Sequence, residues 1–294
     1  MKNSAPIVAT LAALLLVATF VHTKGSDDVP HLRLTVQDDQ ILVVQNPAWK
    51  DNTFRYRLPE FVVSTQTNDM VLRPSPVKRT QKGSIVIAGG AYQESRLFAS
   101  YRIVVADEPD AVAIEATVTN NDSTPWNPGT YSTLCLENAS APDFSDFTGS
   151  QTSIIVGADF MSLDRTAHGR AWDGSAPLHH AHVLSEEDGK WLREYVIKYF
   201  VDTEIVSGSL IVRSTKDGTR HIGVAWNDSR HVSYNLNKKL NCIHSEPRVG
   251  ALESGESQTV RGKIYFVEGP IDEVMQRFKT DFPTLGYGNT ATTR

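Results

Sequence analysis

Alternating apolar and polar positions recur along most of the chain and predict a protein built mainly from β-strands. The clearest stretch is 260–266, where Val260, Gly262, Ile264 and Phe266 fall on one face and charged or aromatic residues on the other. This period of two is typical of a half-buried strand. The same pattern predicts further strands at 31–36, 40–45, 84–88, 101–105, 112–118, 130–136, 153–156, 205–212 and 220–226.

Turn-forming residues separate these segments. Gln37-Asp38-Asp39 and Lys216-Asp217-Gly218 each join two predicted strands and indicate hairpins. Asp107-Glu108-Pro109-Asp110 and Asn120-Asn121-Asp122 mark two more turns. Short strands alternating with such turns favour an antiparallel all-β fold.

One helix is predicted, from Pro270 to Asp281. Proline suits the first turn of a helix because its missing N–H has no partner there. Acidic residues stand in the first turn and basic residues in the last, as the helix dipole favours. The apolar residues Ile271, Val274, Met275 and Phe278 follow helical spacing. This helix is expected to pack against the sheets.

The N-terminus has the layout of a secretory signal. Lys2 precedes an uncharged apolar run from Ile7 to Val21, which is shorter than the roughly 20 residues of a membrane-spanning helix. We therefore expect a signal peptide at 1–24, one β-sandwich domain at 27–285 and a disordered tail at 286–294. This predicts a secreted or periplasmic protein without a membrane span after cleavage; a retained N-terminal anchor is the alternative.

Charge and cysteine content narrow the possible partners. The chain has 29 basic and 34 acidic residues, a net charge of −5, and no long basic run. Nucleic acid is not an expected partner, because phosphate binding needs concentrated Lys and Arg. Cys135 and Cys242 can form one disulfide in an oxidising compartment or remain two buried thiols. Two cysteines are too few for a disulfide-rich scaffold or a multi-cysteine zinc site.

Histidines supply the main candidates for catalysis. His244 and Glu246 are two residues apart, so their side chains share a face of an extended segment. Such a pair can transfer protons, hold a metal or bind a sugar. His180 and His182 repeat this spacing within a cluster that starts at His179. That cluster has a polar loop as its simplest interpretation, with sugar binding, acid/base work or metal binding as alternatives.

Candidates for substrate binding combine tryptophan with polar groups. Trp226, Asp228 and Arg230 follow one another near a predicted turn. Arg170 and Trp172 lie in the irregular stretch 143–193, and long irregular segments often carry binding sites. Tryptophan can stack on a sugar ring, and arginine can clamp a carboxylate with two hydrogen bonds. A core tryptophan beside an ordinary turn is the competing interpretation.

The C-terminal third resembles galactose-mutarotase-like domains. The resemblance lies in Gly223–Trp226, Cys242–Pro247, Leu252–Glu256, Gly262–Phe266 and the helix from Ile271, within 220–282. It implies a β-supersandwich with a sugar-binding face, as in aldose epimerases and domains of polysaccharide lyases and glycoside hydrolases. It also implies a histidine role for His244, although no residue matches the catalytic glutamate of the epimerases.

These observations predict an antiparallel β-supersandwich with one C-terminal helix, or another two-sheet β-sandwich. The expected function is that of an exported carbohydrate-active protein, with His244, His180 and Glu246 as catalytic candidates. His182, Trp172, Arg170, Trp226, Arg230 and Asp228 are the substrate-binding candidates. A non-catalytic glycan-binding or structural protein is the first alternative. A metal-binding protein that uses His179–His182 is the second, and otherwise no cofactor is expected.

Overall fold

The computed structural model describes residues 32–37, 41–64, 67–74, 78–79, 84–93, 96–166, 179–196, 199–201, 204–236 and 241–283. The predicted signal peptide, the predicted tail, Arg170 and Trp172 lie outside these residues. No helix within the described residues is long and apolar enough to cross a membrane.

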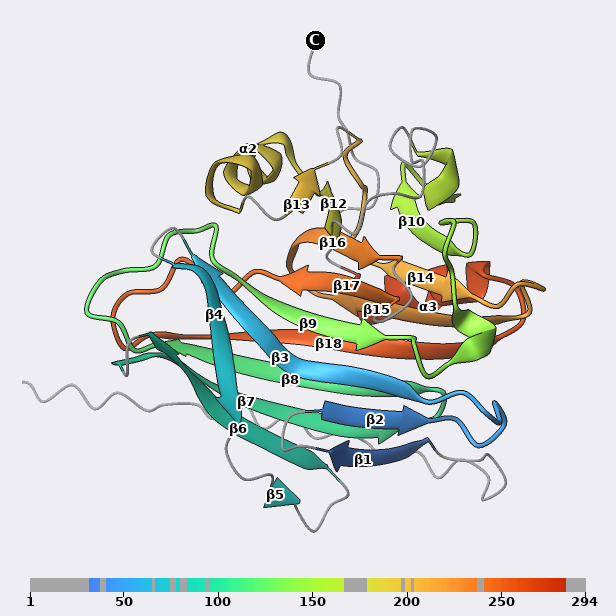
Figure 1. Cartoon of the computed structure of the whole chain (residues 1–294), viewed down its shortest axis with the longest axis horizontal. Helices are drawn as coiled ribbons and strands as arrows, with labels where there is room; N and C mark the ends of the chain where they lie inside the picture. The colour runs from blue at the N-terminus through green and yellow to red at the C-terminus, as the bar shows by residue number, and fades with distance from the viewer. Residues whose placement is uncertain are drawn as a thin grey trace, which may run out of the picture.

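Two antiparallel sheets make up the described part of the chain (Figure 1). Sheet A has the strand order β13-β12-β16-β17-β9-β3-β2-β1. Its strands are β1 (Arg33–Gln37), β2 (Ile41–Gln45), β3 (Phe54–Ser64), β9 (Tyr131–Glu137), β12 (His179–Val183), β13 (Tyr199–Val201), β16 (Ser229–Asn235) and β17 (Cys242–Pro247). All these pairs are antiparallel except β12 with β13.

Sheet B has the order β11-β10-β14-β15-β18-β8-β7-β6-β5. Its strands are β5 (Lys78–Arg79), β6 (Ile85–Gln93), β7 (Arg96–Glu108), β8 (Ala111–Asn120), β10 (Thr152–Val156), β11 (Asp159–Ser162), β14 (Ile211–Ser214), β15 (Arg220–Trp226) and β18 (Ser257–Glu268). Strand β4 (Thr67–Pro74) pairs with β3 and with β6, and so connects the sheets. The helical elements are η1 (Pro142–Phe144), η2 (Leu163–Arg165), α2 (Glu186–Tyr195) and α3 (Asp272–Asp281).

The main hydrophobic core draws residues from both sheets. Tyr56 and Ile243 of sheet A belong to the same buried cluster as Trp226 and Phe266 of sheet B. Strands such as β8 and β18 contribute every second residue to this core, which is why their sequences alternate. The expected all-β class is therefore confirmed.

The alternation predicted around Val260–Phe266 is present in β18. Val260, Gly262 and Ile264 are buried, whereas Arg261 is exposed. Gly262 lies under Trp226, since a Cβ at this glycine would lie 2.6 Å from Cδ2 of that ring. The glycine of this strand thus makes room for the largest side chain of the neighbouring strand.

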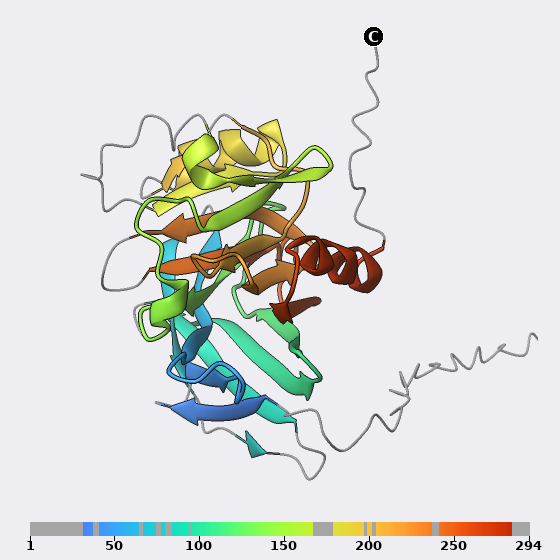
Figure 2. The same cartoon turned by 90° about the vertical axis from the view of Figure 1, so that its right-hand side faces the viewer.

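Helix α3 covers the outer side of sheet B (Figure 2). It begins at Asp272, two residues later than predicted, and its Val274, Met275 and Phe278 form a second buried cluster with residues of sheet B. Tyr265 points away from the main core, as the alternation predicts, but the helix buries it. Helix α3 therefore gives sheet B a second buried face.

Two predictions about local structure are wrong. The expectation of a single helix missed α2, which begins after Ser185, whose Oγ accepts a hydrogen bond from the backbone N–H of Asp188. Ser185 and Asp188 have the spacing of a capping box, a signal that was available in the sequence. The strand predicted at 205–212 begins only at Ile211, because residues 207–209 form bends, with Gly208 beside Phe278.

Candidate functional site

The face of sheet A that points away from the main core carries an unusual number of polar groups, and we call it the polar face. Directly paired residues share a face of a sheet. One row across this face therefore runs from Arg57 on β3 through Cys135 on β9 and His244 on β17 to Ser233 on β16. Strands far apart in the sequence thus bring these groups side by side.

His244, Ser233 and Glu246 form a hydrogen-bonded chain in this row. Nδ1 of His244 lies 2.8 Å from Oγ of Ser233, which also lies 3.2 Å from Oε1 of Glu246. Nδ1 of His244 is 3.7 Å from the same carboxylate oxygen. Both side chains are almost fully buried, at 2% and 0% exposure. The histidine and glutamate therefore share a face and interact through one serine hydroxyl.

Negative groups surround His244. Burial lowers its pKa, but the charge and hydrogen bond of Cys242 and the charges of Glu246 and Glu60 outweigh burial and raise the pKa to about 9. Burial also raises the pKa of Glu60, against the opposing charges of His244 and Arg57. The imidazole and the carboxylates on this face therefore stabilise each other's charged forms.

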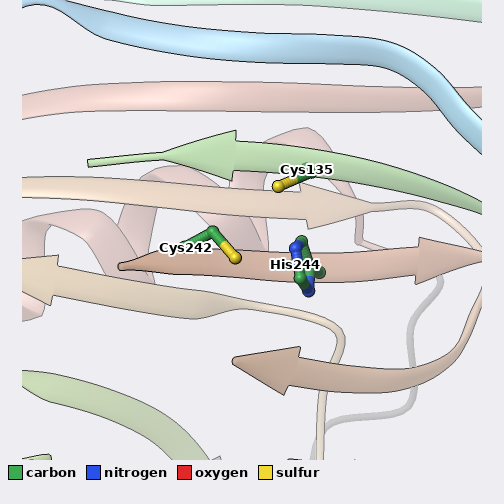
Figure 3. A group of neighbouring side chains, drawn as sticks. All are labelled: Cys135, Cys242 and His244. Atoms are coloured by element: carbon green, nitrogen blue, oxygen red, sulfur yellow. The ribbon is translucent and has the colours of Figure 1, made fainter. Parts of the chain in front are cut away.

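Both cysteines lie beside His244 (Figure 3). Cys242 is on the same strand and Cys135 is directly opposite the histidine on β9. They are buried free thiols. A hydrogen bond to Cys242, together with burial, raises the pKa of Cys135 well above its ordinary value. The sequence left open one disulfide or two buried thiols, and the structure has two buried thiols.

An ion pair lies at the edge of this row. Nε of Arg57 donates a 2.5 Å hydrogen bond to Oε1 of Glu137, and Arg55 lies 3.8 Å from the other carboxylate oxygen. Glu60 follows at an irregular point of β3, where the register with β9 shifts between Arg57 and Phe61. These residues place a guanidinium group and two carboxylates near the thiols and His244.

Helix α2 covers the other end of the polar face. Its Leu192 packs in a small apolar cluster with Tyr131 of β9 and Val183 of β12. The ring of Tyr131 lies edge-on to His231, 4.9 Å between centroids, and His231 is paired directly with Glu246. The helix thus closes the polar face next to the His244–Ser233–Glu246 chain.

Arg230, one of the substrate-binding candidates, contacts helix α2. It occupies the register shift between Ser229 and His231, and its guanidinium lies 4.1 Å from the Trp191 ring. It lies 3.5 Å from Asp188, which also pairs with Arg248 at 2.9 Å. Burial lowers the pKa of Arg230 to about 10, although Asp188 opposes the shift. This arginine therefore holds α2 against the sheet.

The candidates His180 and His182 do not lie beside His244. On β12 these histidines pair with Tyr234 and Val232, which belong to the main core. Their rings stack on Tyr234 with centroids 5.6 and 5.8 Å away. Because side chains alternate along a strand, both point to the face opposite His244.

Trp226 and Asp228 also lie apart from the histidine. Trp226 is fully buried in the main core, as the competing interpretation held. Asp228 is half exposed and lies 3.5 Å from Arg248 at the end of the sheet near α2. Arg170 and Trp172 lie outside the described residues, so their role in substrate binding stays a prediction.

Sequence reasoning missed several groups of the polar face. Ser233, Glu60, Glu137 and Arg57 come from three strands whose pairing is not readable from spacing. One signal was present, since Pro59 inside a strand pattern marks an irregular point where a side chain can be redirected. Cys242 is two residues from His244, a spacing that signals a shared face, whereas the position of Cys135 opposite His244 had no sequence signal.

Comparison with known proteins gives matches only among solved structures. No family model and no curated protein matches the chain. A galactose mutarotase related enzyme from Lactobacillus acidophilus is 9% identical over 82% of this chain and 98% of its own, with a TM-score of 0.41. A putative aldose 1-epimerase from Escherichia coli is 9% identical over 81% of this chain and 99% of its own, with a TM-score of 0.40. A GH36 α-galactosidase from Geobacillus stearothermophilus is 12% identical over 85% of this chain and 42% of its own, with a TM-score of 0.44.

The chain is thus similar to galactose-mutarotase-like structures, the family that residues 220–282 resemble. All have TM-scores below 0.5 and identities below 25%. A fold by itself hosts many activities, so the chemistry has to be argued from the residues of this chain.

Proposed function

We propose that this chain is an exported carbohydrate-active protein that acts on a sugar or a uronic-acid polysaccharide by proton transfer at His244. The observation that carries the proposal is the chain of hydrogen bonds from His244 through Ser233 to Glu246 on the polar face. A histidine held in this way can give a proton to, or take one from, a substrate hydroxyl or a carbon next to a carbonyl.

The arrangement favours an epimerase-like or lyase-like reaction over hydrolysis. Hydrolysis of the usual kind needs two carboxyl groups on either side of a glycosidic bond, about 5–10 Å apart. Here Glu246 and His244 contact one serine hydroxyl, so they act as one proton-transfer unit at one side of the substrate. Epimerisation and β-elimination both depend on such proton transfers.

Groups around His244 are suited to a polar ligand. Arg57 can contact a uronic-acid carboxylate if this contact replaces part of its ion pair with Glu137. Glu60, whose carboxyl group is only partly buried, can accept hydrogen bonds from sugar hydroxyls. Because His244 and Glu246 are buried, a sugar reaches them only after the groups covering this face move aside.

A glycan panel tests the proposal. Monosaccharides, neutral glycans and uronic-acid polysaccharides are screened for a melting shift and for product formation. With an active substrate, His244→Gln and Glu246→Gln should each lower kcat by about 10²–10⁴-fold, the usual contribution of an acid–base group. The matched control is His221→Gln, because His221 is also buried and hydrogen-bonded, to Ser214 and Gly269, but lies on sheet B.

Two results would contradict acid–base catalysis at His244. Turnover that survives His244→Gln in correctly folded protein rules out the histidine. Glycan binding without turnover by the wild type, unchanged in the variant, favours the non-catalytic glycan-binding alternative.

A further inference from the structure

Two thiols and an imidazole meet on the polar face of sheet A (Figure 3). Sγ of Cys135, Sγ of Cys242 and a ring nitrogen of His244 all lie within 4.8 Å of one another. All three residues are buried, with exposures of 1–2%. Strand pairing fixes this arrangement, because Cys135 lies opposite His244 and Cys242 is two residues from it on the same strand.

We infer that Cys135, Cys242 and His244 form a binding site for one thiophilic divalent cation of the zinc type. The inference rests on this cluster and does not depend on the proposed sugar chemistry. Thiolate and imidazole are the ligands that Zn²⁺ prefers, and a site with three protein ligands leaves a fourth position for water or another oxygen.

The spacing of the three ligand atoms suits a tetrahedral ion. With Zn–S bonds of about 2.3 Å and Zn–N bonds of about 2.0 Å, ligand atoms at the corners of a tetrahedron lie roughly 3.5–3.8 Å apart. The upper limit of 4.8 Å in the structure is about 1 Å longer. Small rotations about the cysteine and histidine side-chain bonds can close this difference without moving the backbone of two paired strands.

Charge balance also favours a divalent ion. When Zn²⁺ binds, the two cysteines become thiolates and His244 becomes a neutral imidazole, and the protons that these groups release go to solvent. The two thiolates then cancel the charge of the ion. A neutral complex avoids the large free energy of placing a net charge in a buried site. A monovalent cation would leave the same three ligands with a net negative charge.

Ser233 and Glu246 supply the support that a metal-binding histidine usually has. The hydrogen bond between Ser233 and Nδ1 of His244, with Glu246 behind it, fixes the orientation of the ring. Groups that orient a metal-bound histidine typically change metal affinity by about 10–100-fold when they are removed. A nitrogen that holds an ion cannot exchange protons, so bound zinc is expected to inhibit the proposed sugar chemistry.

The test uses the full chain, purified under reducing conditions and stripped with a chelator. Co²⁺ serves as the spectroscopic probe, because tetrahedral thiolate coordination produces a sulfur-to-metal absorption band and intense visible bands. We expect one equivalent of Co²⁺ to bind, one equivalent of Zn²⁺ to displace it, and Zn²⁺ to raise the melting temperature. Cys135→Ser, Cys242→Ser and His244→Gln should each weaken Zn²⁺ binding by more than 100-fold, and Ser233→Ala by about 10–100-fold.

Controls show whether a variant that loses the metal has lost only the site or its whole fold. The His221→Gln variant should bind Co²⁺ like the wild type, and circular dichroism separates a lost site from a lost fold. If a single variant does not fold, protection of the wild-type thiols from alkylation by Zn²⁺ provides the same test. The inference is overturned if the wild type shows no thiolate-to-cobalt band, if the band survives the double Cys135→Ser/Cys242→Ser change, or if protein from its own compartment carries a Cys135–Cys242 disulfide. None of these readouts requires a sugar substrate, so they stand whether or not the proposed activity is found.

Discussion

At the scale of single residues, Gly262 and Trp226 fit closely together in the main core. A Cβ at Gly262 would lie 2.6 Å from the Trp226 ring, and the ring is enclosed by the main core. The packing around Trp226 therefore depends on the absence of a side chain at one position of β18.

Gly262→Ala should reduce the free energy of unfolding by about 1–3 kcal/mol, because extra volume in a packed core forces neighbouring groups to shift. Urea denaturation followed by tryptophan fluorescence measures the change. Arg261→Ala is the control on the same strand, since Arg261 is 69% exposed and should change stability by less than about 1 kcal/mol. Equal stability of the two variants would contradict the proposed packing.

Asp146 is a buried residue whose charge should make stability depend on pH. Burial raises the pKa of its carboxyl group, but the charge of Arg213, the Thr152 hydroxyl and the backbone N–H groups of Thr148 and Gly149 outweigh burial and lower it. The folded-state pKa thus lies below the unfolded value of about 3.9. The stabilisation is complete above that value and is lost as the pH falls through the folded-state pKa.

Asp146→Asn should cost about 3–5 kcal/mol at pH 7, because Arg213 would keep a buried charge without its partner. The variant should also lose less stability than the wild type when the pH falls from 5 to 2. Denaturant titrations at several pH values test both expectations. If the free energy of unfolding falls equally in the two proteins between pH 5 and pH 2, Asp146 does not contribute to the acid sensitivity.

At the scale of elements, α2 depends on a small set of polar contacts. Its Asp188 accepts from Arg248 and faces Arg230, while Trp191 stacks on the Arg230 guanidinium. The apolar contact of the helix is limited to a small cluster. The ion pairs are therefore expected to decide how firmly α2 is held over the polar face.

Asp188→Asn should increase amide hydrogen exchange in residues 186–195 while the exchange of β17 and β18 stays unchanged. The physical reason is that both arginines lose the charge of Asp188; Arg248 keeps Asp228, but Arg230 is buried. Glu187→Gln, an exposed change in the same turn, is the control. Uniformly faster exchange throughout the chain would instead indicate global destabilisation.

At the scale of the whole molecule, one core joins the two sheets. Trp49, Trp126 and Trp226 are all buried in it, and residues of both sheets surround them. We therefore expect the described part of the chain to unfold as one unit, with neither sheet stable alone.

Unfolding followed by far-UV circular dichroism and by tryptophan fluorescence should give coincident transitions, as a cooperative unit requires. Two separated midpoints would show that the sheets unfold independently. Several central strand pairs join residues distant in sequence, such as β17 with β9 and β18 with β8, so refolding should take milliseconds to seconds or longer.

The sequence alone determined the kind of elements and much of their placement. Alternation is a local property, so β18 and the burial of Val260 and Ile264 were predictable, and the apolar stripe of α3 followed from helical spacing. The shared face of His244 and Glu246 was also predictable, because two residues on one strand keep their relation in any sheet. Only the tertiary structure decided which strands are neighbours. That choice placed Cys135 opposite His244, Ser233 between His244 and Glu246, and His180 and His182 on the other face. Strand pairing and register depend on contacts between distant segments, and no local pattern records them.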